Sequence, residues 1–301
     1  MKPAPFTYHR PETLAEALDV LGQVGAHGKV LAGGQSLLPV LSMRLAAPEH
    51  VVDVNRLAEL AFVRSDPAEG VTVGALARHA AVHRDEAAAR VQPLLREALG
   101  LVAHPVIRNR GTTVGSLAHA DPSGEMTAVL ALLGGTVELA SVAGRRTCAA
   151  ADFFLGPLES DVRPGELAVS AWFPALGVRA GTAFEEIARR HGDYAMAGAA
   201  ALVELDASGS GISSARVAYL SMAPTPVVVD VSAAAPGVSD ASSETAWGGA
   251  VDGAVAQLEP EGDIHATADY RLHLARVLTG RALVRAAGRA LERSQRQREQ
   301  A

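Results

Sequence analysis

The chain has 301 residues, of which 49% are hydrophobic and 20% charged, and its formal net charge is −6 at pH 7. This length suits about two domains, and the acidic balance provides no basic field for nucleic acid or anionic lipid. A single cysteine, Cys148, excludes disulfides within the chain and argues against thiolate-bound iron–sulfur clusters or structural zinc.

The sequence contains neither a signal peptide nor a membrane span that we can identify. Prolines interrupt the N-terminus where a secretory signal needs a continuous apolar core. No apolar run reaches the roughly 18 uncharged residues that a membrane helix requires. We therefore expect a cytoplasmic protein.

The first part of the chain alternates between helical and strand patterns. Residues 10–25 predict a helix that Thr13 caps, because Leu14, Ala17, Leu18 and Leu21 recur at helical spacing. Further elements are expected in order: a strand at 29–33, a short helix at 36–46 interrupted near Pro39, strands at 49–57 and 70–78, a helix at 91–103, a helix and strand at 126–141, and a strand at 166–174.

The pattern changes near residue 177. Residues 180–206 and 215–230 predict strands of an antiparallel sheet, and residues 231–248 a loose connection rich in Ala, Ser and Gly. Helices are expected at 245–258 and 268–294. Because strands and helices are segregated along this part of the chain, the fold class is α+β. We place domains at 1–176 and 177–290, followed by a flexible tail at 291–301.

Two loops of small residues are candidates for ligand binding. Gly33, Gly34, Gln35 and Ser36 follow the strand at 29–33, and a second loop runs over residues 111–116. Glycines let backbone N–H groups approach a ligand closely, and hydroxyls and carboxylates suit phosphate oxygens and ribose. Asp121 and Glu125 follow the second loop and supply carboxylates. Spacing alone leaves a pyrophosphate clamp and an ordinary pair of turns both open.

The order of the residues is more specific than their spacing. Residues 29–57 and 106–125, "KVLAGGQSLLPVLSMRLAAPEHVVDVNRL" and "VIRNRGTTVGSLAHADPSGE", are together similar to the FAD-binding medium subunit of molybdenum hydroxylases. The resemblance is to the carbon monoxide dehydrogenase-like branch of the xanthine dehydrogenase family. It continues in collinear order through "ADFFLGPL", "FEEIARRHGDYAMAGAAA", "VAYLSMAPTPV" and "ADYRLHLARVL".

The resemblance implies a vanillyl-alcohol-oxidase-type (PCMH) FAD-binding domain with subdomains at about 1–56 and 57–176. A C-terminal α+β domain, a sheet packed with helices, closes over it. The two loops would hold the FAD pyrophosphate, Glu125 would lie at the adenosine ribose with Asp121 nearby, Leu167 would cover the ring system and Tyr194 would lie near the isoalloxazine. The expected loop residues are Ala32, Gly33, Gly34, Gln35, Ser36 and Leu37, and Gly111, Thr112, Thr113, Val114, Gly115 and Ser116.

Two positions depart from the family pattern. Val114 stands where the second loop usually has a glycine, so either its φ is ordinary or the loop has shifted. Glu186 stands where the family often has a lysine, which removes a positive charge expected near the flavin. We expect FAD binding to survive both changes.

The resemblance also implies partners. A large chain would hold molybdopterin and oxidise the substrate, and a small chain would carry two [2Fe–2S] clusters, as a dimer of heterotrimers. This chain would pass electrons through FAD to an external acceptor, with no catalytic side chain and no metal of its own. The alternatives are a scaffold that has lost its flavin and a stand-alone flavin oxidase.

Other patterns have simpler interpretations. The segment "GQSLL" around Ser36 lacks the second glycine of a nucleophile elbow, because Leu38 occupies that place. Cys148 is expected to be a buried small hydrophobe. Arginines at 281, 285, 289 and 293 share one helix face, and we expect that face to be solvated, with docking onto an acidic partner as the alternative.

Overall fold

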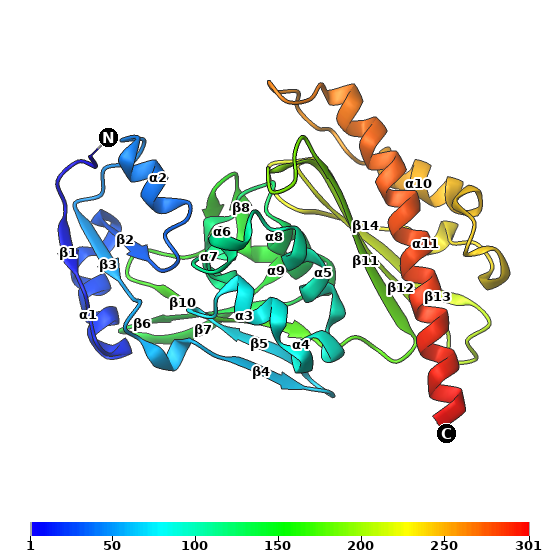
Figure 1. Cartoon of the computed structure of the whole chain (residues 1–301), viewed down its shortest axis with the longest axis horizontal. Helices are drawn as coiled ribbons and strands as arrows, with labels where there is room; N and C mark the ends of the chain where they lie inside the picture. Colours follow the sequence, from blue (N-terminus) through cyan, green and yellow to red (C-terminus); the bar gives the residue numbers. More distant parts are fainter. Residues whose placement is uncertain (1, 301) are drawn as a thin grey trace.

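A computed structural model describes residues 2–300. Three sheets follow one another along the longest axis of the molecule (Figure 1). The N-terminal sheet lies at one end, a five-stranded sheet in the middle, and a four-stranded sheet with the long C-terminal helix at the other end. The α+β class expected from the sequence is confirmed.

The N-terminal sheet has three parallel strands in the order β1-β3-β2. The residues of its strands and of the helices beside it are Thr7–His9 (β1), Leu14–Val24 (α1), Gly25–His27 (η1), Gly28–Leu31 (β2), Leu37–Ser42 (α2) and His50–Asp53 (β3). As the sequence predicts, α1 begins after Thr13, whose hydroxyl accepts the N–H of Glu16 at 3.2 Å. It buries Ala17 and Leu21.

The expected interruption of the second helix is wrong. Pro39 is the third residue of α2 and lies within it. The N–H groups of a first helical turn have no intrahelical partner, so a proline there costs no hydrogen bond.

The middle sheet is antiparallel, in the order β4-β5-β10-β6-β7. Its strands are Val63–Asp66 (β4), Gly70–Gly74 (β5), Thr136–Ser141 (β6), Gly144–Ala149 (β7) and Leu167–Pro174 (β10). A short hairpin, Phe154–Gly156 (β8) with Glu159–Ser160 (β9), and a 3₁₀ turn, Ala58–Leu60 (η2), lie outside it. The segments between the strands form the helices His79–Arg84 (α3), Glu86–Val91 (α4), Pro93–Leu101 (α5), Pro105–Arg108 (α6), Thr113–His119 (α7), Glu125–Leu133 (α8) and Ala150–Phe153 (α9).

The largest core lies between this sheet and its helices. Helix α5 buries four apolar side chains, and eight of the nine residues of α8 are buried. Helix α8 ends at Gly134, whose φ of 66° is the left-handed conformation that glycine adopts without strain. Cys148 is buried beside this core, as expected.

The C-terminal sheet is antiparallel, in the order β11-β12-β13-β14. Its strands are Ala180–Ala188 (β11), Ala195–Leu205 (β12), Ile212–Leu220 (β13) and Val227–Asp230 (β14), and its helices are Gly248–Val255 (α10) and Ala268–Gln300 (α11). Alanine-rich faces let α11 lie very close to the sheet: a Cβ on Gly181 would come 2.1 Å from the carbonyl oxygen of Ala286.

The connection between sheet and helices is more ordered than expected. It forms the 3₁₀ turns Ser232–Ala234 (η3), Val238–Asp240 (η4) and Glu244–Trp247 (η5). The indole of Trp247 is fully buried and donates to the carbonyl of Ala241 at 3.0 Å. A large buried aromatic therefore fixes a segment whose composition looks loose.

The arginine face of α11 contacts the chain itself. Arg285 and Arg289 both bind Glu97 on α5, and Arg293 donates to the carbonyl of Leu176 at 3.2 Å. Arg285 and Arg289 keep partly exposed side chains, so this face is solvated only in part and also packs against the chain. The tail expected at 291–301 is helical as far as Gln300, and residue 301 lies outside the described residues. No helix within residues 2–300 is long and apolar enough to cross a membrane.

Candidate functional site

The two glycine loops lie in direct contact. A Cβ added to Gly33 would lie 2.7 Å from both the carbonyl oxygen of Arg110 and the Cα of Gly111. Any side chain at this position would push the loops apart. The structure therefore brings together two segments almost eighty residues apart in sequence, as the sequence predicts.

The first loop presents a row of free donors. Within residues 2–300, the backbone N–H groups of Gly33, Gly34, Gln35 and Ser36 donate to no acceptor. The φ of Gly34 is +73°, and the side-chain amide of Gln35 donates to the carbonyl of Gly33 at 2.8 Å, which holds the turn in shape. Successive N–H groups in such a turn form a concave site for an anion.

The second loop is shorter than expected, because a helix begins inside it. Thr112 caps α7, and its hydroxyl accepts the N–H of Gly115 at 3.2 Å. Val114 lies in the first turn of that helix, with ordinary φ and 1% exposure. The side chain of Val114 packs into the core. The sequence left open an ordinary φ at this position or a shifted loop, and the structure shows the ordinary φ.

Two residues that the sequence analysis did not single out hold the loops together. Asn55 donates to the carbonyl of Ala32 at 2.8 Å and accepts from Arg78 at 2.6 Å. The other end of the same guanidinium donates to the carbonyl of Arg110 at 2.6 Å. We call Asn55 and Arg78 the loop brace. Asn55 lies two residues after β3 and Arg78 four residues after β5, but their contacts span 23 and 32 positions, which no local sequence pattern predicts.

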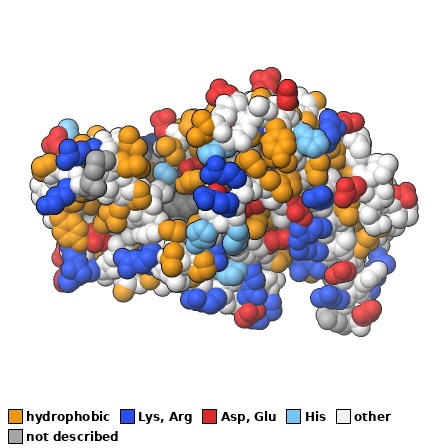
Figure 2. All heavy atoms as spheres, turned by 45° about the horizontal axis from the view of Figure 1, so that its top comes forward, with side chains coloured by type: hydrophobic (Ala, Val, Ile, Leu, Met, Phe, Trp, Pro, Cys, Tyr) orange, Lys and Arg blue, Asp and Glu red, His pale blue; other side chains and the backbone are white. Residues whose placement is uncertain are grey.

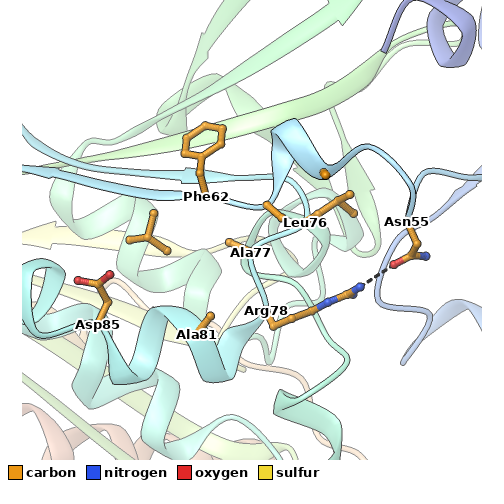
Figure 3. Close-up of a pocket in the computed structure, with 10 residues that line it drawn as sticks. Asn55, Phe62, Leu76, Ala77, Arg78, Ala81 and Asp85 are labelled. Atoms are coloured by element: carbon orange, nitrogen blue, oxygen red, sulfur yellow. Dashed lines mark hydrogen bonds between the residues drawn. The ribbon is translucent and has the colours of Figure 1, made fainter. Parts of the chain in front are cut away.

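A cavity of about 470 Å³ lies beside the loop brace (Figure 3). Asn55 and Arg78 are joined by their hydrogen bond on one side, and the carboxyl group of Asp85 lies well apart from them. Apolar side chains such as Phe62 and Leu76 line the cavity between them. Burial and the neighbouring Arg110 lower the pKa of Arg78.

Three segments converge beside the first loop. The hydroxyl of Tyr194, from the C-terminal domain, faces the carboxylate of Asp121 and the hydroxyl of Ser36. Although 63% of Tyr194 is exposed, surrounding protein atoms and Asp121 raise the pKa of its hydroxyl to about 12. Its hydroxyl is therefore neutral at physiological pH.

The turn before Tyr194 packs closely against His104, the residue that precedes α6. Gly192 has a φ of +85°, and a Cβ there would lie 2.4 Å from the ring of His104. The rings of His104 and His191 are 6.1 Å apart. Figure 2 shows histidine side chains gathered near the middle of one face of the molecule, beside a group of Lys or Arg side chains.

The C-terminal domain also holds the segment that carries Asp121 and Glu125. The backbone N–H of Ser221 donates to the carbonyl of Pro122, and its hydroxyl donates to that of Ser123, each at 2.8 Å. Ser221 has a φ of +61°, which is strained for a residue other than glycine. Buried Arg271 donates to the carbonyl of Ser221 at 3.1 Å and holds it in place.

Glu125 and Leu167 are more enclosed than the sequence predicts. Glu125 is the first residue of α8 and only 9% exposed, and burial, followed by Glu186, raises its pKa to about 8. Burial raises the pKa of Glu186 itself to about 7. Leu167 is 3% exposed at the start of β10, packed in the core and paired with Ala140. Among the described residues no group of His, Cys, Asp and Glu is arranged to hold a metal ion.

Known families match both halves of the chain. Residues 4–176 match the family described as the FAD binding domain in molybdopterin dehydrogenase, and residues 182–286 match the CO dehydrogenase flavoprotein C-terminal domain.

Individual proteins match over nearly the full length. The alpha subunit of the 6-hydroxypseudooxynicotine dehydrogenase complex of Paenarthrobacter nicotinovorans is 38% identical over 96% of this chain and 97% of its own length. The carbon monoxide dehydrogenase medium chain of Hydrogenophaga pseudoflava is 36% identical over 94% of this chain and 97% of its own.

A solved structure has the same fold. It is that of Hydrogenophaga pseudoflava carbon monoxide dehydrogenase lacking the Mo-pyranopterin moiety of its molybdenum cofactor. One of its chains superposes with a TM-score of 0.87 at 36% identity, covering 96% of this chain and 99% of that one. The chain is therefore an FAD-binding oxidoreductase subunit, and it belongs to the medium-chain family of carbon monoxide dehydrogenase-type molybdenum hydroxylases within the xanthine dehydrogenase family.

Proposed function

We propose that this chain carries FAD as the electron-exit subunit of a three-part molybdenum hydroxylase. The observation that carries the proposal is the contact between two glycine loops, one of which presents free backbone N–H groups. When bound, FAD accepts electrons and passes them to an external acceptor, and the protein supplies position and electrostatics.

The residues fit the pyrophosphate of FAD. The N–H groups of Gly33 to Ser36 would bind its oxygens from one side, and the start of α7 near Thr112 would complete the cradle from the other. The absence of side chains at positions 33 and 34 leaves the backbone accessible. Neighbouring members of the cradle would be Ala32, Leu37, Gly111, Thr113, Val114, Gly115 and Ser116.

The remaining predicted residues would act around the cradle. Neutral Tyr194 would donate from its hydroxyl beside Ser36 of the first loop. Asp121 would accept from a ribose hydroxyl or from Tyr194. Leu167, which is enclosed in the core, would support the flavin end by packing and not by direct cover. This chain would then need no general acid or base of its own.

Partner chains follow from the names of the relatives. One relative is a subunit of a dehydrogenase complex, another is a medium chain, and the superposed chain comes from a carbon monoxide dehydrogenase whose molybdenum cofactor lacks the Mo-pyranopterin moiety in that structure. By analogy, a large chain would hold molybdopterin and a small chain two [2Fe–2S] clusters that deliver electrons singly. Assembly as a dimer of heterotrimers and a cytoplasmic location stay predictions from the sequence.

The first test is the visible absorption spectrum of the purified full chain, with identification of any released cofactor. We expect one FAD per chain and neither iron nor molybdenum. A colourless protein that takes up no added FAD would contradict the proposal and favour a scaffold. Reduction of the flavin by an organic substrate without partners would instead identify a stand-alone oxidase.

A matched pair of variants tests the cradle. In Gly33→Ala the new methyl group would meet Arg110 and Gly111, so we expect FAD binding to weaken at least tenfold. In the control Gly249→Ala, on α10, the methyl group meets nothing within 4 Å. Equal FAD content in the two variants, with both folded by circular dichroism, would contradict the cradle.

A further inference from the structure

Three strained backbone positions meet at the C-terminal end of α7. In the described part of the chain, five residues other than glycine have a φ in the left-handed region. Three of them are Ala120 at +52°, Leu158 at +60° and Ser221 at +61°. Leu158 donates its backbone N–H to the carbonyl of Ala120 at 3.0 Å, and Ser221 donates its own to the carbonyl of Pro122 at 2.8 Å. Strain of this kind persists only where surrounding structure fixes it, and it gathers at ligand sites.

The hydroxyl of Ser221 contacts two further segments. It donates to the carbonyl of Ala195, the first residue of β12, at 2.6 Å, and it lies 2.8 Å from the hydroxyl of Ser123. Ser123 in turn donates its backbone N–H to Oδ1 of Asp121 at 2.8 Å. A glycine would adopt the backbone conformation of position 221 without strain, but it could make neither side-chain contact. Position 221 therefore combines a strained backbone with a side chain that glycine could not replace.

A buried arginine fixes the same two strand ends. Arg271, in the first turn of α11, is 6% exposed. One of its guanidinium nitrogens donates to the carbonyl of Ser221 at 3.1 Å and to the carbonyl of Met196. The other donates to the carboxylate of Asp263 at 2.7 Å. The N–H, the carbonyl and the hydroxyl of Ser221 are therefore all bonded, which is how a strained residue is held in place.

These contacts lie beside two residues that we assign to the FAD site. Asp121 lies two positions before Ser123, in the FAD-binding domain. Tyr194 lies directly before Ala195, in the C-terminal domain. The hydroxyl of Ser221 thus joins the turn that follows Asp121 to the strand that follows Tyr194. Without this hydroxyl the two segments would lose the group that they both contact.

We infer that Ser221 is a positioning residue of the FAD site, which holds Asp121 and Tyr194 in a fixed relative position across the two domains. The inference rests on the proposed FAD site. Ser221 itself needs no contact with FAD, because it fixes the backbone next to each of the two side chains. Such preorganisation strengthens binding, since less conformational freedom is lost when the ligand binds.

Two substitutions separate positioning from a purely structural role. Ser221→Ala removes the hydroxyl and keeps the strain, whereas Ser221→Gly removes the hydroxyl and relieves the strain. We therefore expect Ser221→Gly to unfold at a higher urea concentration than Ser221→Ala. FAD affinity should not follow this order, because both variants lack the hydroxyl that joins the two segments.

The experiment is a titration of the flavin-free full chain with FAD, followed by flavin fluorescence. We expect the dissociation constant to rise about tenfold in both Ser221→Ala and Ser221→Gly, which is the size of effect that one lost hydrogen bond produces. The visible circular dichroism of bound FAD at saturation should change as well. The control is Ser213→Ala, at the opposite end of β13, which removes a hydroxyl that donates to the carbonyl of Glu204 at 3.2 Å. It should change neither measurement.

The outcomes separate the two proposals. Absence of FAD binding by the wild type would contradict the proposed function. Binding by the wild type, with unchanged affinity and circular dichroism in both Ser221 variants, would contradict the positioning role alone. Affinity that recovers in Ser221→Gly would also contradict it, because stability and not the hydroxyl would then set the affinity.

A double-mutant cycle tests the contact between the two hydroxyls. We expect Ser123→Ala to weaken FAD binding, and Ser123→Ala combined with Ser221→Ala to bind FAD no more weakly than Ser221→Ala alone, because either substitution breaks the same contact. Losses of affinity that multiply in the combined variant would mean that the two serines act independently, which would contradict the inference.

Discussion

The loop brace shows how single residues fix the distance between two backbone segments. Arg78 bonds both Asn55 and the carbonyl of Arg110, so one guanidinium fixes the separation of the loops. Lysine cannot replace it, because an ammonium lacks the planar fork that reaches two acceptors in different directions.

We predict that Arg78→Ala weakens FAD binding about tenfold and lowers the free energy of unfolding by about 2 kcal/mol, since it removes two charge-assisted hydrogen bonds. FAD titration and urea denaturation measure the two effects. Arg90→Ala, at an exposed position on α4, is the control and should change neither. A brace that serves only stability would leave FAD affinity unchanged.

At the residue scale the sequence predicted the two loops but not their brace. Glycine pairs after a strand have a local signature, because their conformational freedom is useful only where backbone must approach something closely. The contacts of Asn55 and Arg78 depend on tertiary structure. The raised pKa of Glu125 was not predicted either. It depends on burial and on the charge of Glu186, which lies sixty-one positions away in the sequence.

At the scale of elements, the contact between α5 and α11 joins the two domains. Glu97 is 18% exposed and accepts from both Arg285 and Arg289. The periodic spacing of the arginines predicted that they share a face. It did not predict what that face contacts, because periodicity carries no information about the neighbouring element.

We predict that Glu97→Gln destabilises the chain by about 1–2 kcal/mol, less than for a fully buried pair because both arginines are partly solvated. The loss should shrink in 1 M salt, where screening weakens the wild-type interaction. The control Glu292→Gln removes the exposed pair with Arg296 and should have little effect. Equal losses in the two variants, measured by chemical denaturation, would mean that the contact does not join the domains.

At the scale of the whole molecule, different carboxyl groups make stability depend on pH in opposite directions. Hydrogen bonds from Arg146 hold the pKa of Asp161 below its usual range, so its contribution to stability is lost as pH falls through that lowered value. Burial raises the pKa values of Glu125 and Glu186. Between their ordinary value near 4.5 and the raised values, the folded chain binds more protons than the unfolded chain, so stability falls as pH rises.

We therefore predict that the flavin-free chain is most stable near pH 4.5 and loses stability from there up to about pH 8, beyond which the curve flattens. For Glu186 the loss is at most about 3.5 kcal/mol, since the pKa rises from 4.5 to about 7 and each unit of pKa shift corresponds to about 1.4 kcal/mol. Glu186→Gln should be more stable than the wild type at pH 8.5 and nearly equal to it at pH 5. Urea denaturation at the two pH values measures this difference. Loss of stability in Glu186→Gln at both pH values would contradict this prediction. It would mean that the folded chain stabilises Glu186 as an ionised carboxylate and not as a protonated acid.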